Sequence, residues 1–120
     1  MKVLIVDDSR AMRMMVRRSL RQAGFSGLEF DDAANGKEGL EKYQSFSPDL
    51  VLSDWNMPEM DGLEFLIALK ASHPTAKFGF ITSQATAIMR KQASDAGALF
   101  LISKPFSPEG FRDTLQPYLS

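Results

Sequence analysis

The sequence predicts an α/β fold in which five short parallel strands alternate with five helices. The first observation is a set of short, continuous apolar runs, the pattern of strands buried on both faces. The second is that the segments between these runs have the length and the apolar spacing of helices. Strands that alternate with helices form a parallel sheet covered by helices on both faces, which gives three layers. The 120 residues contain no long linker and no internal repeat, so we expect one domain over residues 1–120.

The predicted strands are the apolar runs themselves. They lie at residues 3–6, 28–30, 50–52, 78–81 and 99–102. The run at 28–30 is short and weakly apolar.

The predicted helices lie at residues 9–23, 35–46, 62–72, 86–96 and 107–116. In the first of them, Met12, Val16, Leu20 and Ala23 form an apolar stripe at helical spacing. Glycines stand at two of the expected helix ends and a serine-proline pair at one expected start, namely Gly24, Gly97 and Ser107-Pro108.

The composition excludes several kinds of site. There is no cysteine, which excludes disulfides, thiolate metal sites and cysteine nucleophiles, and His73 is the only histidine. The formal net charge of −1 argues against binding nucleic acid or anionic membranes through bulk charge. The opening apolar run is too short for a signal peptide, and no apolar stretch approaches the length of a membrane span. We therefore expect a cytoplasmic protein.

Polar residues follow four of the predicted strands, where each strand ends. Asp7 and Asp8 follow the first, Asp54 the third, Thr82 the fourth and Lys104 the fifth. Ligands of open parallel sheets bind beyond the carboxyl ends of the strands, where the strand order reverses. If the first and third strands are neighbours there, the three carboxylates converge on one small volume.

This combination of residue types suits metal-assisted phosphoryl transfer. Clustered carboxylates repel one another unless a cation is present, and Mg²⁺ prefers a few carboxylate oxygens together with a phosphate. Asp54 is the natural nucleophile, because carboxylates form acyl phosphates, and Lys104 and Thr82 supply a cation and a hydroxyl donor for phosphate oxygens. Acids are also common at strand ends because turns favour Asp, and Asp7-Asp8 alone would be explained as a helix cap. The agreement of four strand ends favours the site.

Several sequence blocks resemble one known family over essentially the whole chain. They are VLIVDDS at 3–9, AANGKEGL at 33–40, PDLVLSDWNMPEMDGLEFL at 48–66, FITS at 80–83 and KPF at 104–106. These blocks are similar to the receiver domains of bacterial two-component response regulators, the CheY-like family. The resemblance implies a flavodoxin-like (βα)5 three-layer sandwich with the parallel strand order 2-1-3-4-5.

The resemblance also implies roles for these residues. Asp54 would accept a phosphoryl group from a histidine kinase, a phosphotransfer protein or a small acyl phosphate. Mg²⁺ would be bound by Asp8, Asp54 and the backbone carbonyl of Asn56, and Asp7 would hold a water on the metal. Thr82 and Lys104 would contact the phosphoryl group, and the bond before Pro105 is often cis in this family.

Within the family, the DDS-x-x-x-R opening and Trp55-Asn56 are most similar to stand-alone chemotaxis receivers, which signal to a flagellar motor switch. Two positions depart from that pattern. Leu101 stands where an aromatic residue is usual, with Phe100 beside it, so an aromatic switch is in doubt. Gln84 replaces an acid, and with Asn56 it is expected to flank the path of the attacking water.

Two surfaces are candidates for partner binding. The usual output face of the family, made by the fourth helix, fifth strand and last helix, would here include Ile88, Met89, Arg90, Lys91, Phe100, Leu101, Phe106 and Phe111. Five arginines lie at 10–21 without an acid among them and form either a docking face for the phosphodonor or a solvated basic face. Met12 and Met15 of the same segment are expected to fill the core.

Other functions on the same pattern are less consistent with the residues. An aspartyl-phosphate hydrolase would carry Asp-x-Asp after the first strand and a separate cap, whereas this chain has adjacent acids there and its nucleophile on the third strand. A flavin site would need glycine- or hydroxyl-rich phosphate loops in place of Asp7-Asp8. A receiver that has lost phosphorylation would not keep the complete acidic, Thr82 and Lys104 set. A receiver taken from a larger response regulator, or an adaptor in a phosphorelay outside chemotaxis, stays open as an alternative.

Overall fold

The computed structural model describes residues 1–119 and contains ten elements in strict strand-helix alternation. In chain order these are β1 (Lys2–Val6), α1 (Arg10–Gln22), β2 (Glu29–Ala33), α2 (Gly36–Phe46), β3 (Leu50–Ser53), α3 (Gly62–Ser72), β4 (Phe78–Thr82), α4 (Ala87–Asp95), β5 (Phe100–Ser103) and α5 (Pro108–Leu119). All strand pairs are parallel, and the strand order is β2-β1-β3-β4-β5. The flavodoxin-like fold expected from the sequence is therefore confirmed.

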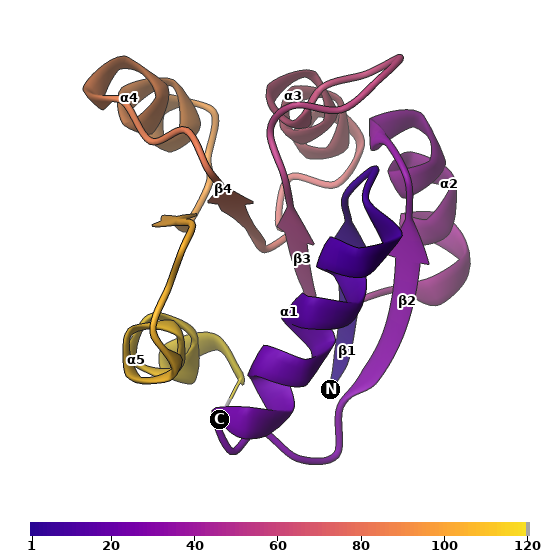
Figure 1. The fold of residues 1–120 in the computed structure, drawn as a ribbon. Helices are drawn as coiled ribbons and strands as arrows, with labels where there is room; N and C mark the ends of the chain where they lie inside the picture. Colours follow the sequence, from indigo (N-terminus) through magenta and orange to yellow (C-terminus); the bar gives the residue numbers. More distant parts are fainter. Residues whose placement is uncertain (120) are drawn as a thin grey trace.

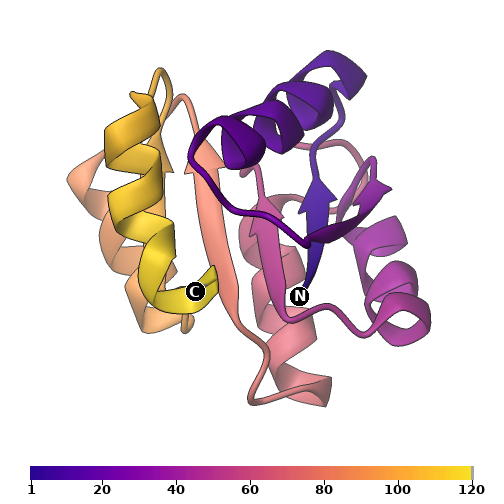
Figure 2. The ribbon, with the colours of Figure 1, turned by 90° about the horizontal axis from the view of Figure 1, so that it is seen from below.

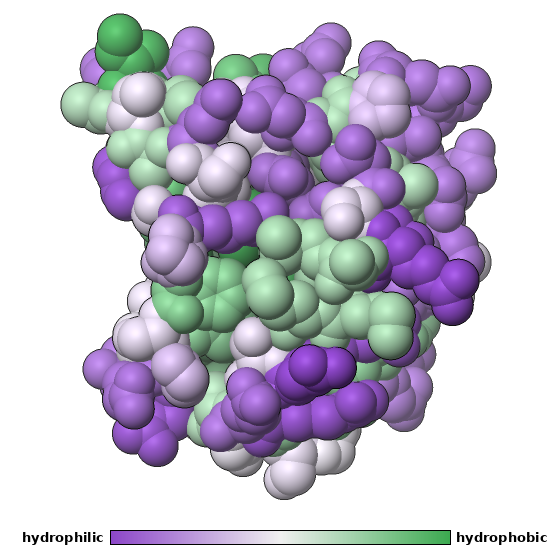
Figure 3. Space-filling view, viewed as in Figure 1, coloured by the Kyte–Doolittle hydropathy of each residue, from purple (hydrophilic) through white to green (hydrophobic). Residues whose placement is uncertain are grey.

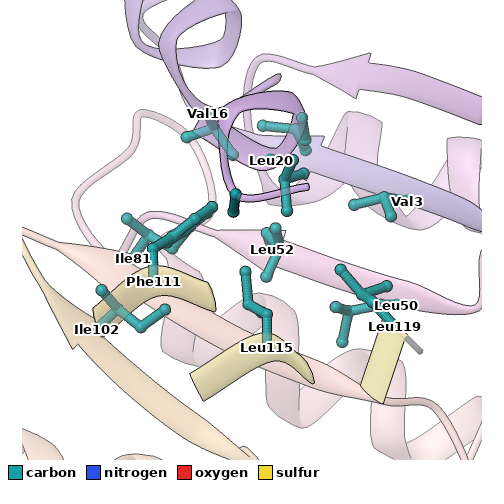
Figure 4. Close-up of a cluster of buried hydrophobic side chains, with 12 residues drawn as sticks. Val3, Val16, Leu20, Leu50, Leu52, Ile81, Ile102, Phe111, Leu115 and Leu119 are labelled. Carbon is teal, nitrogen blue, oxygen red and sulfur yellow. The ribbon is translucent and has the colours of Figure 1, made fainter. Parts of the chain in front are cut away.

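Helices cover both faces of the sheet. Figures 1 and 2 show α1 and α5 together on one face, with α2, α3 and α4 on the other. Each face has its own core, because strand side chains point alternately to the two sides. The core under α1 and α5 includes Leu20, Leu52, Phe111 and Leu115, all essentially inaccessible to solvent (Figure 4).

The residues predicted to end helices lie at helix ends in the structure, and a capping residue begins α1. Ser9 caps α1, its hydroxyl oxygen accepting a hydrogen bond from the Met12 backbone N–H at 3.2 Å. Gly24 and Gly97 follow α1 and α4 with φ of 94° and 100°, a left-handed backbone region in which glycine avoids the Cβ clash of other residues. In the described part of the chain, no helix is long and apolar enough to cross a membrane.

Two element boundaries differ from the prediction by three residues, and the others differ by one residue at most. The second strand was predicted at 28–30, but β2 continues through Asp31 and Asp32 to Ala33. These acids are tolerated because β2 is an edge strand whose side chains are half-exposed and reach basic partners on α1 and α2. The last helix was predicted to end at 116, but α5 runs to Leu119, whose side chain is buried in the core.

Two side-chain predictions were wrong. Phe111 was placed on the output face, but it has no exposed surface and stacks on Phe106 with ring centroids 4.5 Å apart. Met15 was expected in the core but is 43% exposed. Both errors arise at helix positions whose orientation depends on how the helix rolls against the sheet, which spacing alone leaves undetermined.

Candidate functional site

The three carboxylates of the site meet at the carboxyl ends of β1 and β3. Val6 and Ser53 are register partners in the sheet, and the Asp54 backbone N–H donates to the Val6 carbonyl at 2.9 Å. This pairing sets the residues after the two strands side by side. One carboxylate oxygen from each of Asp7, Asp8 and Asp54 lies within 4.8 Å of the others. The convergence that the strand-end pattern predicted is present in the structure.

The β1–α1 loop holds Asp7 in a fixed, buried position. Asp7 is 5% exposed, and its Oδ1 accepts a hydrogen bond from the Ser9 backbone N–H at 2.9 Å. Its own backbone N–H donates to the carbonyl of Ala33 at 3.0 Å. Since Ser9 caps α1, neither aspartate is needed as the cap, and the helix-cap explanation for Asp7-Asp8 does not apply.

The carboxylate of Asp54 is oriented by its neighbours. Its Oδ1 accepts the Trp55 backbone N–H at 2.7 Å, and its Oδ2 lies 3.5 Å from the ammonium nitrogen of Lys104. The same Lys104 nitrogen lies 3.4 Å from Asp7 Oδ2. Lys104 therefore bridges the two carboxylates from the far side of β3, with only 13% of its side chain exposed.

Thr82 lies at the end of β4, in the strand between β3 and β5. It is completely buried, and its hydroxyl oxygen accepts the Gln84 backbone N–H at 3.3 Å. The Lys104 backbone N–H donates to the Thr82 carbonyl at 2.8 Å, which ties the two strand ends together. The bond between Lys104 and Pro105 is cis, as the resemblance led us to expect.

A side-chain hydrogen bond joins two loops of the site. The Asn56 amide nitrogen donates to Gln84 Oε1 at 3.2 Å, linking the loop after β3 to the loop after β4. Both residues are exposed, so the pair lies at the solvent side of the carboxylates.

The loop after Asp54 is packed so closely that only glycine fits at the start of α3. The Gly62 backbone N–H donates to the Trp55 carbonyl at 2.7 Å. A Cβ on Gly62 would overlap the carbonyl oxygen of Asp54 and press on the Phe80 ring. Asp61 and Glu64 form a capping box at the same helix start. The backbone of Asp54 is therefore held from both sides.

Electrostatics makes the three-carboxylate cluster receptive to a cation. Burial raises the pKa of Asp7, and the nearby Asp54 charge raises it further, while the Ser9 N–H and Lys104 lower it. The net direction is upward, so Lys104 alone does not compensate for the loss of water around Asp7. Three clustered carboxylates with uncompensated negative charge match the preference of Mg²⁺ for oxygen ligands, and Asp7, Asp8 and Asp54 fit as the residues that would hold it, directly or through a water.

The fifth strand presents its aromatic and aliphatic residues to opposite faces. Phe100 packs with the core under α1 and α5, and its ring lies 5.5 Å from that of Tyr118. Leu101 packs against the core on the other side, as does Met89 of α4. The position where the family usually has an aromatic residue is therefore aliphatic, and Phe100 does not face α4 in its place.

A groove lies beside the carboxylates, between α1 and the loop after β5. Its volume is about 670 Å³, and it is lined mainly by apolar groups that include Met12, Met15, Pro105 and Phe106. Lys104 and Arg18 also line it. Figure 3 shows apolar surface at the centre of the face on which α1 lies. Met15 therefore lines a surface groove instead of the core.

Three arginines of α1 contact residues of the edge strand β2. Arg13 and Arg17 pair with Asp32 of β2, and Arg17 and Arg21 lie over the Phe30 ring. These contacts are structural and were not predicted, because they depend on the two acids in the edge strand.

Arg13 also touches the site. Its guanidinium donates to the backbone carbonyl of Asp7 at 2.6 Å. In the sequence, Arg13 belongs to the basic stripe and is also the arginine of the DDS-x-x-x-R opening. Its contact with the Asp7 carbonyl was not predicted, although the arginine lies one helical turn after the cap that follows Asp7-Asp8.

Known proteins are similar to this chain over nearly its full length. Residues 3–116 match the family of response regulator receiver domains. The chain is 38% identical over 107 residues to the chemotaxis protein CheY of Thermotoga maritima, covering 89% of this chain and 88% of that protein. The structure of the chemotaxis protein CheY4 of Vibrio cholerae has a TM-score of 0.86 and 37% identity, with 98% of both chains covered.

A further similar structure comes from a complex. A chain of the CheX–CheY–BeF3–Mg²⁺ complex of Borrelia burgdorferi has a TM-score of 0.82 and 28% identity, covering 99% of this chain and 90% of that chain. The fold, the family match and the identity to CheY proteins agree. This chain belongs to the response regulator receiver domain family.

Proposed function

We propose that this protein is a cytoplasmic signalling domain that accepts a phosphoryl group on Asp54 in a Mg²⁺-dependent reaction. The donor is a histidine kinase or a phosphotransfer protein, and the pathway is chemotaxis. The observation that carries the proposal is the bridging position of Lys104, whose ammonium group lies within 3.5 Å of both Asp7 and Asp54. This places a cation next to a nucleophilic carboxylate and beside a buried hydroxyl.

The site residues have different roles in phosphoryl transfer. Asp54 Oδ2 attacks the phosphorus, so that an Asp54 O–P bond forms while the P–N bond of phosphohistidine breaks and the imidazole leaves. The Trp55 N–H holds the other carboxylate oxygen and so fixes the attacking geometry. Mg²⁺ bound to Asp8, Asp54 and the Asn56 carbonyl would neutralise the acidic cluster and the incoming phosphoryl oxygens. Positioning and charge stabilisation are what this reaction chiefly needs.

Phosphorylation of Asp54 increases the negative charge next to Lys104 and Thr82. A phosphoryl group carries about −1.5 to −2 charges in place of one carboxylate. Lys104 shifts from bridging two carboxylates to a phosphoryl oxygen, and the Thr82 hydroxyl, which already accepts from Gln84, donates its proton to another. Since the two strand ends are joined by a backbone hydrogen bond, they move as a unit. The movement biases the adjoining surface between two conformations.

The partner surface in this proposal is the face of α4, β5 and α5. Ile88 is 73% exposed at the start of α4, and Arg90 donates to the Leu101 carbonyl at 3.3 Å. The Borrelia burgdorferi relative forms a complex with CheX, which supports protein targets of this kind. The target is a CheX-type protein or a flagellar motor switch. The groove lined by Lys104 and Arg18 lies near Asp54, which Lys104 contacts, and suits the approach of the phosphodonor.

The experiment is phosphotransfer from an autophosphorylated histidine kinase domain with labelled phosphate. We expect label to move to the wild-type protein in Mg²⁺ and to stay on the kinase in EDTA. Asp54→Asn and Lys104→Ala variants should accept little or no label, whereas Lys91→Ala, which removes an exposed lysine paired only with Asp95 in the described chain, should accept it normally. Equal labelling of wild type and Asp54→Asn would contradict the proposal.

A further inference from the structure

We infer that Arg13 is a positioning residue that fixes the peptide between Asp7 and Asp8, so that the Asp8 carboxylate faces the metal site. Asp32 of β2 anchors Arg13 in turn. The inference deepens the proposed function and rests on it, since it concerns the Mg²⁺ ligands.

The contacts form a chain from the sheet edge to the site. Arg13 donates through one terminal nitrogen to the Asp7 carbonyl at 2.6 Å, and its Nε lies 3.4 Å from Asp32 Oδ2. Arg17 holds the other Asp32 oxygen at 2.6 Å. The Arg13 side chain is only 15% exposed, so this guanidinium is not a freely solvated charge. A planar guanidinium can hold two partners at fixed directions, which the ammonium of lysine does not do.

The Asp7 carbonyl controls where Asp8 points. The peptide unit is planar, so fixing the carbonyl oxygen of Asp7 also fixes the direction of the Asp8 N–H and the position of its Cα. Asp7 itself is held at its N–H by Ala33 and at its carboxylate by Ser9. Asp8 is exposed, and the described residues provide no hydrogen bond to its side chain. Its orientation within the cluster therefore depends on the backbone before it.

Positioning and simple electrostatics predict opposite effects. Arg13 is a cation near three carboxylates, so if it acted only through charge, its removal would strengthen Mg²⁺ binding. If it acts by holding the Asp7–Asp8 peptide, its removal weakens Mg²⁺ binding, as loss of a residue that orients a metal ligand generally does. The direction in which the Kd for Mg²⁺ changes therefore distinguishes a positioning role from a charge effect.

The test is Mg²⁺ titration of the purified chain by calorimetry, with Trp55, the only tryptophan, as an independent fluorescence reporter. We expect the Kd for Mg²⁺ to rise about tenfold in Arg13→Met. Arg13→Lys keeps the charge and should show most of the same loss. Asp32→Asn removes the anchor but not Arg13 and should give a smaller rise. The matched control Arg10→Met removes an exposed cation from the same helix and should leave the Kd unchanged or lower it.

Unchanged or tighter Mg²⁺ binding in Arg13→Met, with wild-type binding intact, would overturn this inference and leave the proposed function standing. Absence of Mg²⁺ binding by the wild type would overturn both. Amide hydrogen exchange measured without metal is a second readout. The amide of Ser9, which donates to Asp7 Oδ1, should exchange faster in Arg13→Met than in Arg10→Met at equal thermal stability, and equal exchange would also contradict the inference.

Discussion

The ring of Phe100 occupies the space beside Gly79 that any larger residue in β4 would fill. A Cβ built on Gly79 would overlap the atoms of that ring, and Gly79 is buried in the sheet. Phe100 is thereby committed to the α5 side of the sheet, where it packs near Tyr118. The aromatic side chain of β5 therefore packs on the α5 side of the sheet, and Leu101 packs on the α4 side.

Gly79→Ala is expected to destabilise the protein by about 1–3 kcal/mol, because the added methyl overpacks the slot that holds Phe100. Elsewhere in a strand interior the same change would be mildly stabilising. The measurement is denaturant unfolding of the single variants and of Gly79→Ala/Phe100→Ala. The double variant should lose clearly less stability than the sum of the single losses. If the loss in the double variant equals the sum of the two single losses, the Phe100 ring does not limit the space beside Gly79.

Asp7→Asn is expected to stabilise the metal-free protein at neutral pH. Burial raises the pKa of Asp7, so between the ordinary value of 3.8 and the raised value the native state binds more protons than the unfolded chain. The contribution of this group to stability therefore falls as pH rises through that window and stays lowered above it. Thermal unfolding in EDTA across pH should show the Asp7→Asn advantage at pH 7 and its disappearance in acid.

Saturating Mg²⁺ should reverse that order. A ligand that binds only the native state at 100 times its Kd adds about 2.7 kcal/mol, and Asp7→Asn should lose much of this gain. Equal stabilisation of both proteins by Mg²⁺ would exclude Asp7 from the metal site.

Gln84→Ala is expected to shorten the lifetime of the phosphoryl group several-fold. The bond between Asn56 and Gln84 joins the two loops on the solvent side of Asp54, and breaking it admits water more readily. The decay of labelled protein, after removal of the donor, measures this rate. Ser83→Ala, at the exposed neighbouring position, is the matched control and should decay as the wild type does. A slower or unchanged decay in Gln84→Ala would show that the pair does not shield the site.

Ile88→Asp is expected to weaken binding of a CheX-type or motor-switch target while leaving stability within about 0.5 kcal/mol of wild type, because the side chain is largely exposed. Phe111→Ala, in contrast, should cost about 3–5 kcal/mol, because that ring lies in the core (Figure 4). Binding is measured with phosphorylated protein and stability by denaturant unfolding. Undiminished target binding by a folded Ile88→Asp variant would exclude α4 from the partner surface.

The fold and the convergence of the site residues were predictable, because apolar runs mark the parallel strands and the site residues directly follow them. Buried parallel strands are continuous apolar runs, and the parallel arrangement brings the residues that follow them to one edge, as with Asp7, Asp54 and Lys104. The extent of β2 was missed because its acids are explained only by the arginines across the helix-sheet interface. Phe111 and Met15 were misplaced because burial of a helical residue depends on the helix roll. The contact of Arg13 with the Asp7 carbonyl involves a backbone atom, and residue types carry little information on such contacts.

The most direct test of the central claim is the intact mass of the protein after incubation with acetyl phosphate and Mg²⁺. The account predicts one phosphoryl adduct, absent in EDTA and absent in Asp54→Asn, while Asp61→Asn, which changes an acid in the same loop outside the cluster, still forms it. An adduct that persists in Asp54→Asn, or none on the folded wild-type protein, would contradict the account.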